Sequence, residues 1–473
     1  MAISVRRMAT GFTLLAGFIS ITQASAPIIL QQMLLSKNST DTHAIPAMFG
    51  SPGQTVNLII STTSARSWVY APTLCASLAA GSARRSCEAS IAAGGGRATT
   101  PLYNPASSST WKQASTSFTY EGPNNQQRFV GALGTDKVTI GGVDVSNFEF
   151  GVVTEVNVED DQIASIVGTA GLDGGIGGVL GLGGDSNFLK YLVDKGAIKS
   201  SSIGVQLASM VLFDDAENVK AYPARRIVPF GTESTEFPGN IILGGYDGEK
   251  IDTQATGGGG LNSRNEIETS VTQLTSSWFD GAHTDAVQHT IEYQAGAGGG
   301  GSDGATGTPA VIDSTSPFIL IPQAFWNKMS SHWTRGNVNK TTGRTYYSDP
   351  SGFRDWRNFT FDLVSKDGTK SQVIMQHFDW NVWDPEVGFW APAFKLQPPG
   401  VGTLVLGRPA IRALYIAVDW DKKEAKTVPL KKRTTEVVKI VQVISGTCGR
   451  IAMPLNALVI GVMVVGIIVG EYL

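Results

Sequence analysis

The sequence has few charged residues and no basic excess. Of its 473 residues only 16% are Asp, Glu, Lys or Arg, and the formal net charge is −3. A typical soluble domain has about a quarter of its residues charged. Because nucleic-acid binding requires a concentration of positive charge, this composition favours a protein without a nucleic-acid partner.

Cysteine and histidine are also scarce, with three and five residues respectively. The histidines are scattered, and no two cysteines have the C-x-x-C spacing of a zinc or redox site. We therefore expect no metal and no cofactor. Cys75 and Cys87 are close in sequence, which favours a local disulfide in an oxidising compartment. Cys448 lies near the C-terminal end of the chain.

Residues 1–26 have the features of a secretory signal peptide. Two arginines precede a short apolar run, and an A-x-A cleavage motif ends at Ala26. Because Pro27 follows directly, cleavage after Ala24 is the alternative. A signal anchor is disfavoured because the apolar run is too short to span a bilayer.

Residues 447–473 contain a second apolar run. Small residues at Ser445 and Gly446, a short spacer and an apolar tail match the signal for a glycosylphosphatidylinositol (GPI) anchor. A single-pass membrane helix is usually followed by basic residues, and none follows here. The pattern favours GPI attachment and leaves a transmembrane tail open. Residues 431–446 read as a polar stalk before this tail.

Three N-glycosylation sequons agree with export from the cell. They begin at Asn38, Asn339 and Asn358. Together with the two terminal segments, they predict passage through the secretory pathway to the cell surface. The protein would then be extracellular and membrane-attached, either by a GPI anchor or by a single span.

Between the two ends the pattern is that of β-structure with an internal repeat. Residues 57–69 and 309–322 each read as a buried apolar strand, a run of hydroxyl residues and a second apolar strand. An apolar, glycine-rich segment follows each of them, at 174–183 and 402–407. A phosphate-binding loop is excluded at 174–183 because no strand–helix unit surrounds it.

This repeat predicts two similar lobes. We assign residues 45–205 to an N-terminal lobe and residues 206–430 to a C-terminal lobe. Residues 27–44 form a short lead-in before the first lobe.

These motifs, taken in order, resemble those of the pepsin-like aspartic proteases (peptidase A1). The resemblance covers about residues 45–430. It implies an all-β, bilobal fold with two pseudo-twofold-related, β-barrel-like lobes around a cleft, in a monomer. Six segments correspond to motifs of this family. Residues 50–54 match G-T-P-x-Q, residues 61–69 match D-T-G-S-S-x-x-W-V, and residues 178–182 match G-I-L-G-L. Residues 240–247 match L-x-L-G-G-x-D, residues 310–322 match A-I-V-D-T-G-T-S-x-x-x-x-P, and residues 404–419 match L-G-x-x-F-x-R-x-Y-x-x-F-D.

The resemblance implies two catalytic aspartates, and only one is present. Asp313 stands at the second position, whereas Ser61 replaces the first. The family mechanism needs one carboxyl as base and one as acid on a shared water. A serine without a partner base cannot take the missing role, so we expect no proteolysis. A hydrogen-bonded turn residue is the competing interpretation of Asp313.

Other positions keep the scaffold of that site. Thr62 and Ser314 stand where hydroxyls of the family cross-link the two lobes by hydrogen bonds. Trp68 and Tyr120 stand where the family has a tryptophan beneath its flap and a tyrosine on it. Core packing for Trp68 and an ordinary hairpin position for Tyr120 are the alternatives.

Three further departures point away from an active protease. Thr63 and Thr315 replace the glycines of the two turns, and we expect β-branched side chains to strain a backbone built for glycine. The flap after Tyr120 lacks the family's Gly-Thr-Gly-Ser tip and is longer. The lead-in is too short for the propeptide that blocks an active family member.

We therefore expect a proteolytically inactive, pepsin-like cell-surface protein that binds a peptide or protein ligand in its cleft. Two alternatives stay open. One is an atypical, active aspartic-type endopeptidase that uses Asp313 with another group. The other is a structural surface protein whose cleft is vestigial.

Overall fold

A computed structural model of the protein describes most of the two predicted lobes. The described residues are 26–34, 43–77, 84, 102–121, 128–157, 176–207, 209–211, 235–237, 239–252, 258–279, 287–292, 307–332, 336–338, 343, 345–347, 356–364, 368, 370–375, 381–384, 389–430, 440–442 and 451–452. Most of residues 431–473, and residues 1–25 of the predicted signal peptide, lie outside this set.

The N-terminal lobe is an eight-stranded sheet that closes on itself. Its order is β2-β3-β4-β9-β5-β8-β7-β6, and an additional pairing of β3 with β7 joins the sheet into a barrel. Its strands are β2 (Met33–Leu34), β3 (His43–Phe49), β4 (Gln54–Ser61), β5 (Trp68–Tyr70), β6 (Lys112–Glu121), β7 (Arg128–Ile140), β8 (Val143–Asn157) and β9 (Gly178–Gly181). Its helical turns are α1 (Leu74–Ser77), η2 (Pro105–Ser107) and α4 (Asn187–Asp194).

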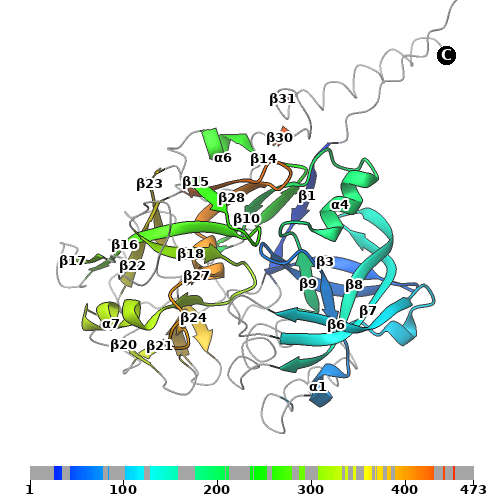
Figure 1. The fold of residues 1–473 in the computed structure, drawn as a ribbon, viewed down its shortest axis with the longest axis horizontal. Helices are drawn as coiled ribbons and strands as arrows, with labels where there is room; N and C mark the ends of the chain where they lie inside the picture. The colour runs from blue at the N-terminus through cyan, green and yellow to red at the C-terminus, as the bar shows by residue number, and fades with distance from the viewer. Residues whose placement is uncertain are drawn as a thin grey trace, which may run out of the picture.

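The C-terminal lobe lies beside it and is also built of strands (Figure 1). Its main strands are β15 (Gly258–Leu261), β16 (Ile267–Phe279), β17 (Val287–Glu292), β18 (Thr308–Ile312), β19 (Ile319–Ile321), β22 (Trp356–Val364), β23 (Lys370–Met375), β26 (Phe394–Leu396) and β27 (Leu404–Leu406). Two-stranded pairs are β11 (Ser209–Val211) with β12 (Thr235–Phe237), β20 (Gly336–Val338) with β21 (Thr345–Tyr347), and β24 (Asn381–Asp384) with β25 (Phe389–Pro392). Its helices are α6 (Gly248–Asp252), α7 (Gln323–His332) and α9 (Arg408–Ile411).

A run of strands between the lobes connects them. Its order is β1 (Ile28–Gln31), β13 (Asn240–Leu243), β10 (Ser202–Gln206), β28 (Leu414–Asp419) and β29 (Glu424–Pro429), all antiparallel. The predicted lead-in is therefore part of the fold, because its strand β1 pairs Ile28 with Leu243. The predicted lobe boundary at residue 205 falls inside β10.

The two lobes repeat the same strand arrangement at their centres. In the N-terminal lobe β4 runs parallel to β9, with Ser61 opposite Gly181. In the C-terminal lobe β18 runs parallel to β27, with Ile312 opposite Leu406. The next strand in each lobe, β5 or β19, pairs antiparallel to β9 or β27. The all-β, bilobal architecture expected from the sequence is thereby confirmed.

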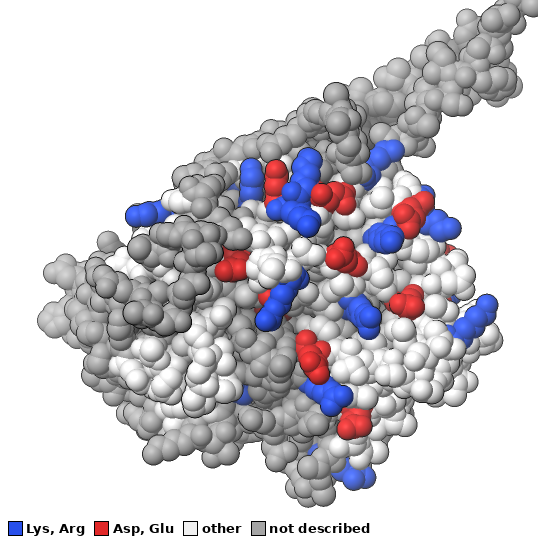
Figure 2. All heavy atoms as spheres, viewed as in Figure 1, with Lys and Arg blue, Asp and Glu red and all other residues white. Residues whose placement is uncertain are grey.

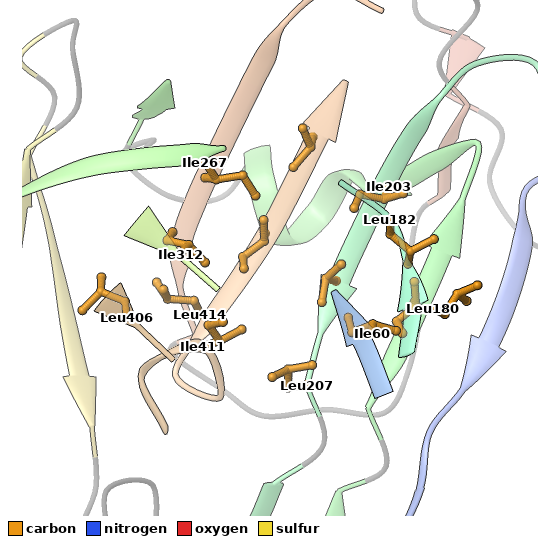
Figure 3. Close-up of a cluster of buried hydrophobic side chains, with 14 of the residues drawn as sticks. Ile60, Leu180, Leu182, Ile203, Leu207, Ile267, Ile312, Leu406, Ile411 and Leu414 are labelled. Carbon is orange, nitrogen blue, oxygen red and sulfur yellow. The ribbon is translucent and has the colours of Figure 1, made fainter. Parts of the chain in front are cut away.

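One hydrophobic core runs through both lobes and the strands between them. Figure 3 shows Ile60 and Leu180 of the N-terminal lobe, Ile203 of the connecting strands, and Ile312 and Leu406 of the C-terminal lobe. All five are at most 3% exposed. Because Ile60 and Ile312 come from the two strands that end at the hydroxyl-rich turns, the core fixes where those turns meet.

Some elements differ from the pattern read in the sequence. Residues 240–247, which match the family's L-x-L-G-G-x-D motif, form two strands, β13 and β14 (Gly245–Asp247), on either side of Gly244, whose φ of +80° favours glycine. Strand β30 (Ile440–Gln442), within the predicted stalk, pairs with β14, and β31 (Ile451–Ala452), within the predicted C-terminal tail, pairs with β30. Among the described residues no helix is both long and apolar enough to cross a membrane.

Candidate functional site

The two hydroxyl-rich turns meet back to back through four reciprocal hydrogen bonds. The Thr62 amide donates to Ser314 Oγ (3.0 Å), and the Ser314 amide donates to Thr62 Oγ1 (3.2 Å). Thr62 Oγ1 donates to the carbonyl oxygen of Ile312 (3.1 Å), and Ser314 Oγ to that of Ile60 (2.8 Å). Both side chains are buried. These residues therefore join the lobes at the point where β4 and β18 end.

Ser61 lies at the first position of the N-terminal turn and is fully buried. Its Oγ accepts hydrogen bonds from the amides of Ser64 (2.8 Å) and Thr63 (3.4 Å). Its one hydroxyl contact is Thr63 Oγ1, at 3.3 Å. Ser61 Oγ thus stabilises the turn as a hydrogen-bond acceptor, and among the described residues no basic group of the kind that activates a serine nucleophile hydrogen-bonds it.

Asp313 lies at the equivalent position of the C-terminal turn. Its Oδ1 accepts hydrogen bonds from Thr315 Oγ1 (2.7 Å), the Thr315 amide (3.0 Å) and Thr63 Oγ1 (3.1 Å). Its Oδ2 has no hydrogen-bond partner among the described residues. Burial raises the pKa of Asp313, the hydrogen bonds from Thr315 and Thr63 oppose this, and the charge of Glu266 adds to it. The net shift is upward, which favours the neutral acid.

Thr63 connects the two turns. Its hydroxyl is 3.3 Å from Ser61 Oγ and 3.1 Å from Asp313 Oδ1, so one side chain contacts both positions. The strain expected from threonine in these turns is absent, because neither Thr63 nor Thr315 has a positive φ. Each threonine hydroxyl instead donates to Asp313, so the substitution adds hydrogen bonds that glycine could not make.

Tyr120 and Trp68 form an aromatic layer beside these turns. Their ring centroids are 4.4 Å apart in a stacked arrangement, and Phe129, across the hairpin from Tyr120, lies 5.5 Å from Trp68. Burial is the main cause of the raised pKa of Tyr120, the charge of Asp313 adds to it, and a hydrogen bond with Thr63 opposes it. Tyr120 therefore lies close to both turns, and Trp68, at 1% exposed, is also core.

Glu266 is a residue of this site that the sequence did not reveal. It ends the turn between β15 and β16 and is half-buried. Strand β16 pairs with β18 so that Glu268 is opposite Val311. Continuing that register by two residues places Glu266 across from Asp313, and its charge acts on both Asp313 and Tyr120. The signal is a strand pairing, which cannot be read from local sequence.

Of the other predicted site residues, the structure describes Cys75 and Asn358. Cys75 is disulfide-bonded, while its predicted partner Cys87 lies outside the described residues. Asn358 lies in β22, between β16 and β23. Among the described residues, no group of three or more His, Cys, Asp or Glu could hold a metal ion. The remaining predicted positions, which are outside the described residues, are Asn38, Asn339, Ser445 and Gly446.

Residues 43–221 match the family model described as eukaryotic aspartyl protease. The match spans strands β3 to β9 of the N-terminal lobe, including Ser61, Trp68 and Tyr120. A search of curated proteins finds no match to the chain.

Proposed function

The chain carries a eukaryotic aspartyl protease domain over residues 43–221, and we propose that it is a proteolytically inactive, peptide-binding protein of the cell surface. The signal peptide, the sequons and the C-terminal apolar tail support its location. The inactivity and the binding are supported by the geometry around Asp313.

The position of the Thr63 hydroxyl is the observation that carries the inactivity. A water activated by two carboxyls must hydrogen-bond to both of them. Here Thr63 Oγ1 lies 3.3 Å from Ser61 Oγ and 3.1 Å from Asp313 Oδ1, so it takes the place such a water would need. The site therefore lacks the first carboxyl and also the room for the nucleophile.

The same geometry supports binding. The turns are held by buried hydrogen bonds from both lobes, and Asp313 Oδ2 has no partner among the described residues. Tyr120, which is stacked on the buried Trp68, supplies an aromatic ring next to it. A rigid polar centre beside aromatic rings can hold an extended peptide without losing conformational freedom on binding.

One observation favours a second candidate, an atypical endopeptidase. Glu266 is a carboxylate across from Asp313, and it could replace the missing aspartate as the second acid–base group. An endopeptidase of this kind would need both carboxyls for cleavage. In an inactive protein, replacing either carboxyl changes no cleavage activity.

A cleavage assay separates the two candidates. The full-length protein in detergent is incubated with an unfolded, fluorescently quenched protein substrate at each pH from 3 to 7. We expect no cleavage above that of the Asp313→Ala variant at any pH. Cleavage that disappears in Asp313→Ala and in Glu266→Gln, but persists in Glu268→Gln, would establish the endopeptidase and refute inactivity.

A further inference from the structure

We propose that Glu266 is the specificity-determining residue of the Asp313 site and that it selects peptides carrying a lysine or arginine side chain. This inference rests on the proposed peptide-binding function. It names the chemical class of ligand that the site would prefer.

The strand register puts Glu266 on the same face as Asp313. Extending the register of β16 with β18 by one residue beyond the pair of Glu268 with Val311 brings Ile267 opposite Ile312, and both of these side chains are fully buried in the core (Figure 3). Successive side chains of a strand point to opposite faces. Glu266 and Asp313 therefore lie on the face away from that core, where cross-strand neighbours interact.

The carboxylate of Glu266 has no counter-ion within the described part of the chain. It forms no ion pair there, and neither does Asp313. Glu266 Oε2 accepts a hydrogen bond from the side-chain amide of Asn262 (2.8 Å), and Oε1 has no partner among the described residues. Its negative charge is felt by Asp313 and by Tyr120. A cationic group placed beside Glu266 would therefore find a negative charge that no described residue compensates.

The turn that carries Glu266 is fixed in advance. The Asn262 amide donates to the Glu266 carbonyl (3.0 Å), and the Glu266 amide donates to Asn262 Oδ1 (3.0 Å). The turn also reaches the N-terminal lobe, where Asn265 Nδ2 donates to Asp185 Oδ2 (3.3 Å). Because the carboxylate is already held in position, a cationic ligand can pair with it without the entropic cost of ordering a loop.

The preference is local and does not depend on a broad surface field. On the face shown in Figure 2, basic and acidic side chains are interspersed over the described residues. Long-range steering of cationic peptides is therefore weak. A half-buried carboxylate, in contrast, interacts strongly with a cation at short range, because solvent screens it less. An acidic ligand side chain would be repelled by the same group.

The experiment is a peptide-binding scan on the full-length protein in detergent. The probes are fluorescein-labelled octapeptides of fixed apolar sequence in which one position at a time carries lysine, norleucine or glutamate. Norleucine matches the lysine stem without its charge. Binding is followed by fluorescence anisotropy for the wild type, for Glu266→Gln, and for Glu268→Gln as the matched control. Glu268 lies on the same face, two residues further along β16 and opposite the uncharged Val311.

We expect at least one position at which the lysine peptide binds the wild type about tenfold more tightly than the norleucine peptide, a difference of about 1.4 kcal/mol. Glu266→Gln should abolish this difference, and Glu268→Gln should keep it. The norleucine peptides should bind all three proteins equally.

Three results would overturn the inference. If peptides bind without a lysine preference, or if the preference is unchanged in Glu266→Gln, Glu266 does not set specificity, and the binding function itself stands. If no peptide binds the wild type, the proposed binding function fails together with the inference. If the peptides are cleaved, and cleavage is lost in Glu266→Gln, the residue belongs to catalysis.

Discussion

The two central turns share their scaffold hydrogen bonds but differ in chemistry. Ser64 Oγ donates to the Arg66 carbonyl (2.8 Å), and Ser316 Oγ donates to the Phe318 carbonyl (2.7 Å). Thr62 and Ser314 make matching bonds across the junction. The first residue of each turn breaks the match, because Ser61 carries a hydroxyl where Asp313 carries a carboxyl. The difference shows that the bonds holding such turns are separable from the groups that perform catalysis.

The strongest test of the comparison restores the missing chemistry. Ser61→Asp alone should give no cleavage, because the Thr63 hydroxyl still fills the place of the water. Ser61→Asp with Thr63→Gly and Thr315→Gly should raise cleavage of an unfolded protein at acid pH by about 10²-fold or more, the scale of general acid–base catalysis. Initial rates measure the gain. Equal activity of the single and triple variants would show that Thr63 does not block the site.

The next largest effect comes from breaking the junction itself. Thr62→Val keeps the shape but leaves the Ser314 amide and the Ile312 carbonyl without their partner. Because a buried unsatisfied polar group costs about 1–3 kcal/mol, the free energy of unfolding should fall by about 2–5 kcal/mol. Guanidinium unfolding measures it. The matched control, Thr119→Val on the exposed side of β6, should change it by less than about 0.5 kcal/mol.

A third test uses the raised pKa of Asp313. Its ordinary value is 3.8, and in the folded state the pKa lies higher because of burial. The folded protein then binds more protons than the unfolded one above pH 3.8, so this contribution to stability is present at lower pH and is lost as pH rises through the folded pKa. Asp313→Asn should therefore remove this decrease in stability with rising pH.

Asp136 provides the contrast for this test. Burial acts to raise its pKa, but hydrogen bonds from Thr110, Tyr103, Ser108 and the Lys137 amide together lower it. Its contribution to stability is therefore lost as pH falls. Melting temperatures from pH 3 to 7 should change with opposite slopes in Asp313→Asn and Asp136→Asn, each relative to the wild type. Slopes of the same sign would contradict the assigned directions.

The smallest expected effect isolates the bridge between the turns. Thr63→Val keeps the β-branched shape and removes the hydroxyl that contacts Ser61 and Asp313. Loss of one hydrogen bond at a half-buried site should lower the free energy of unfolding by about 1 kcal/mol. Chemical unfolding measures this decrease, with Thr119→Val as the control variant. A change as large as that of Thr62→Val would mean that Thr63, too, holds the lobes together.

The sequence predicted the scaffold of this site well and its electrostatics poorly. The hydroxyl-rich turns follow apolar strands in the sequence, and the resemblance to the pepsin-like proteases assigned Thr62, Ser314 and Asp313 to their positions in these turns. Glu266 could not be placed in this way, because its position depends on how β16 pairs with β18, some 40 residues away along the chain. The prediction of backbone strain at Thr63 was wrong, because its backbone has a negative φ and its hydroxyl donates a hydrogen bond to Asp313.

The pairing of β1 with β13 has a consequence for the order of assembly. Ile28 finds its partner Leu243 only after more than two hundred further residues have been made. Pairings between distant parts of a chain form slowly, whereas neighbouring strands can pair early. The barrel of the N-terminal lobe can therefore close during synthesis, before strand β1 has paired with β13. Until β13 and β28 arrive, β10 has exposed edges, and the nascent chain is most prone to aggregation in that interval.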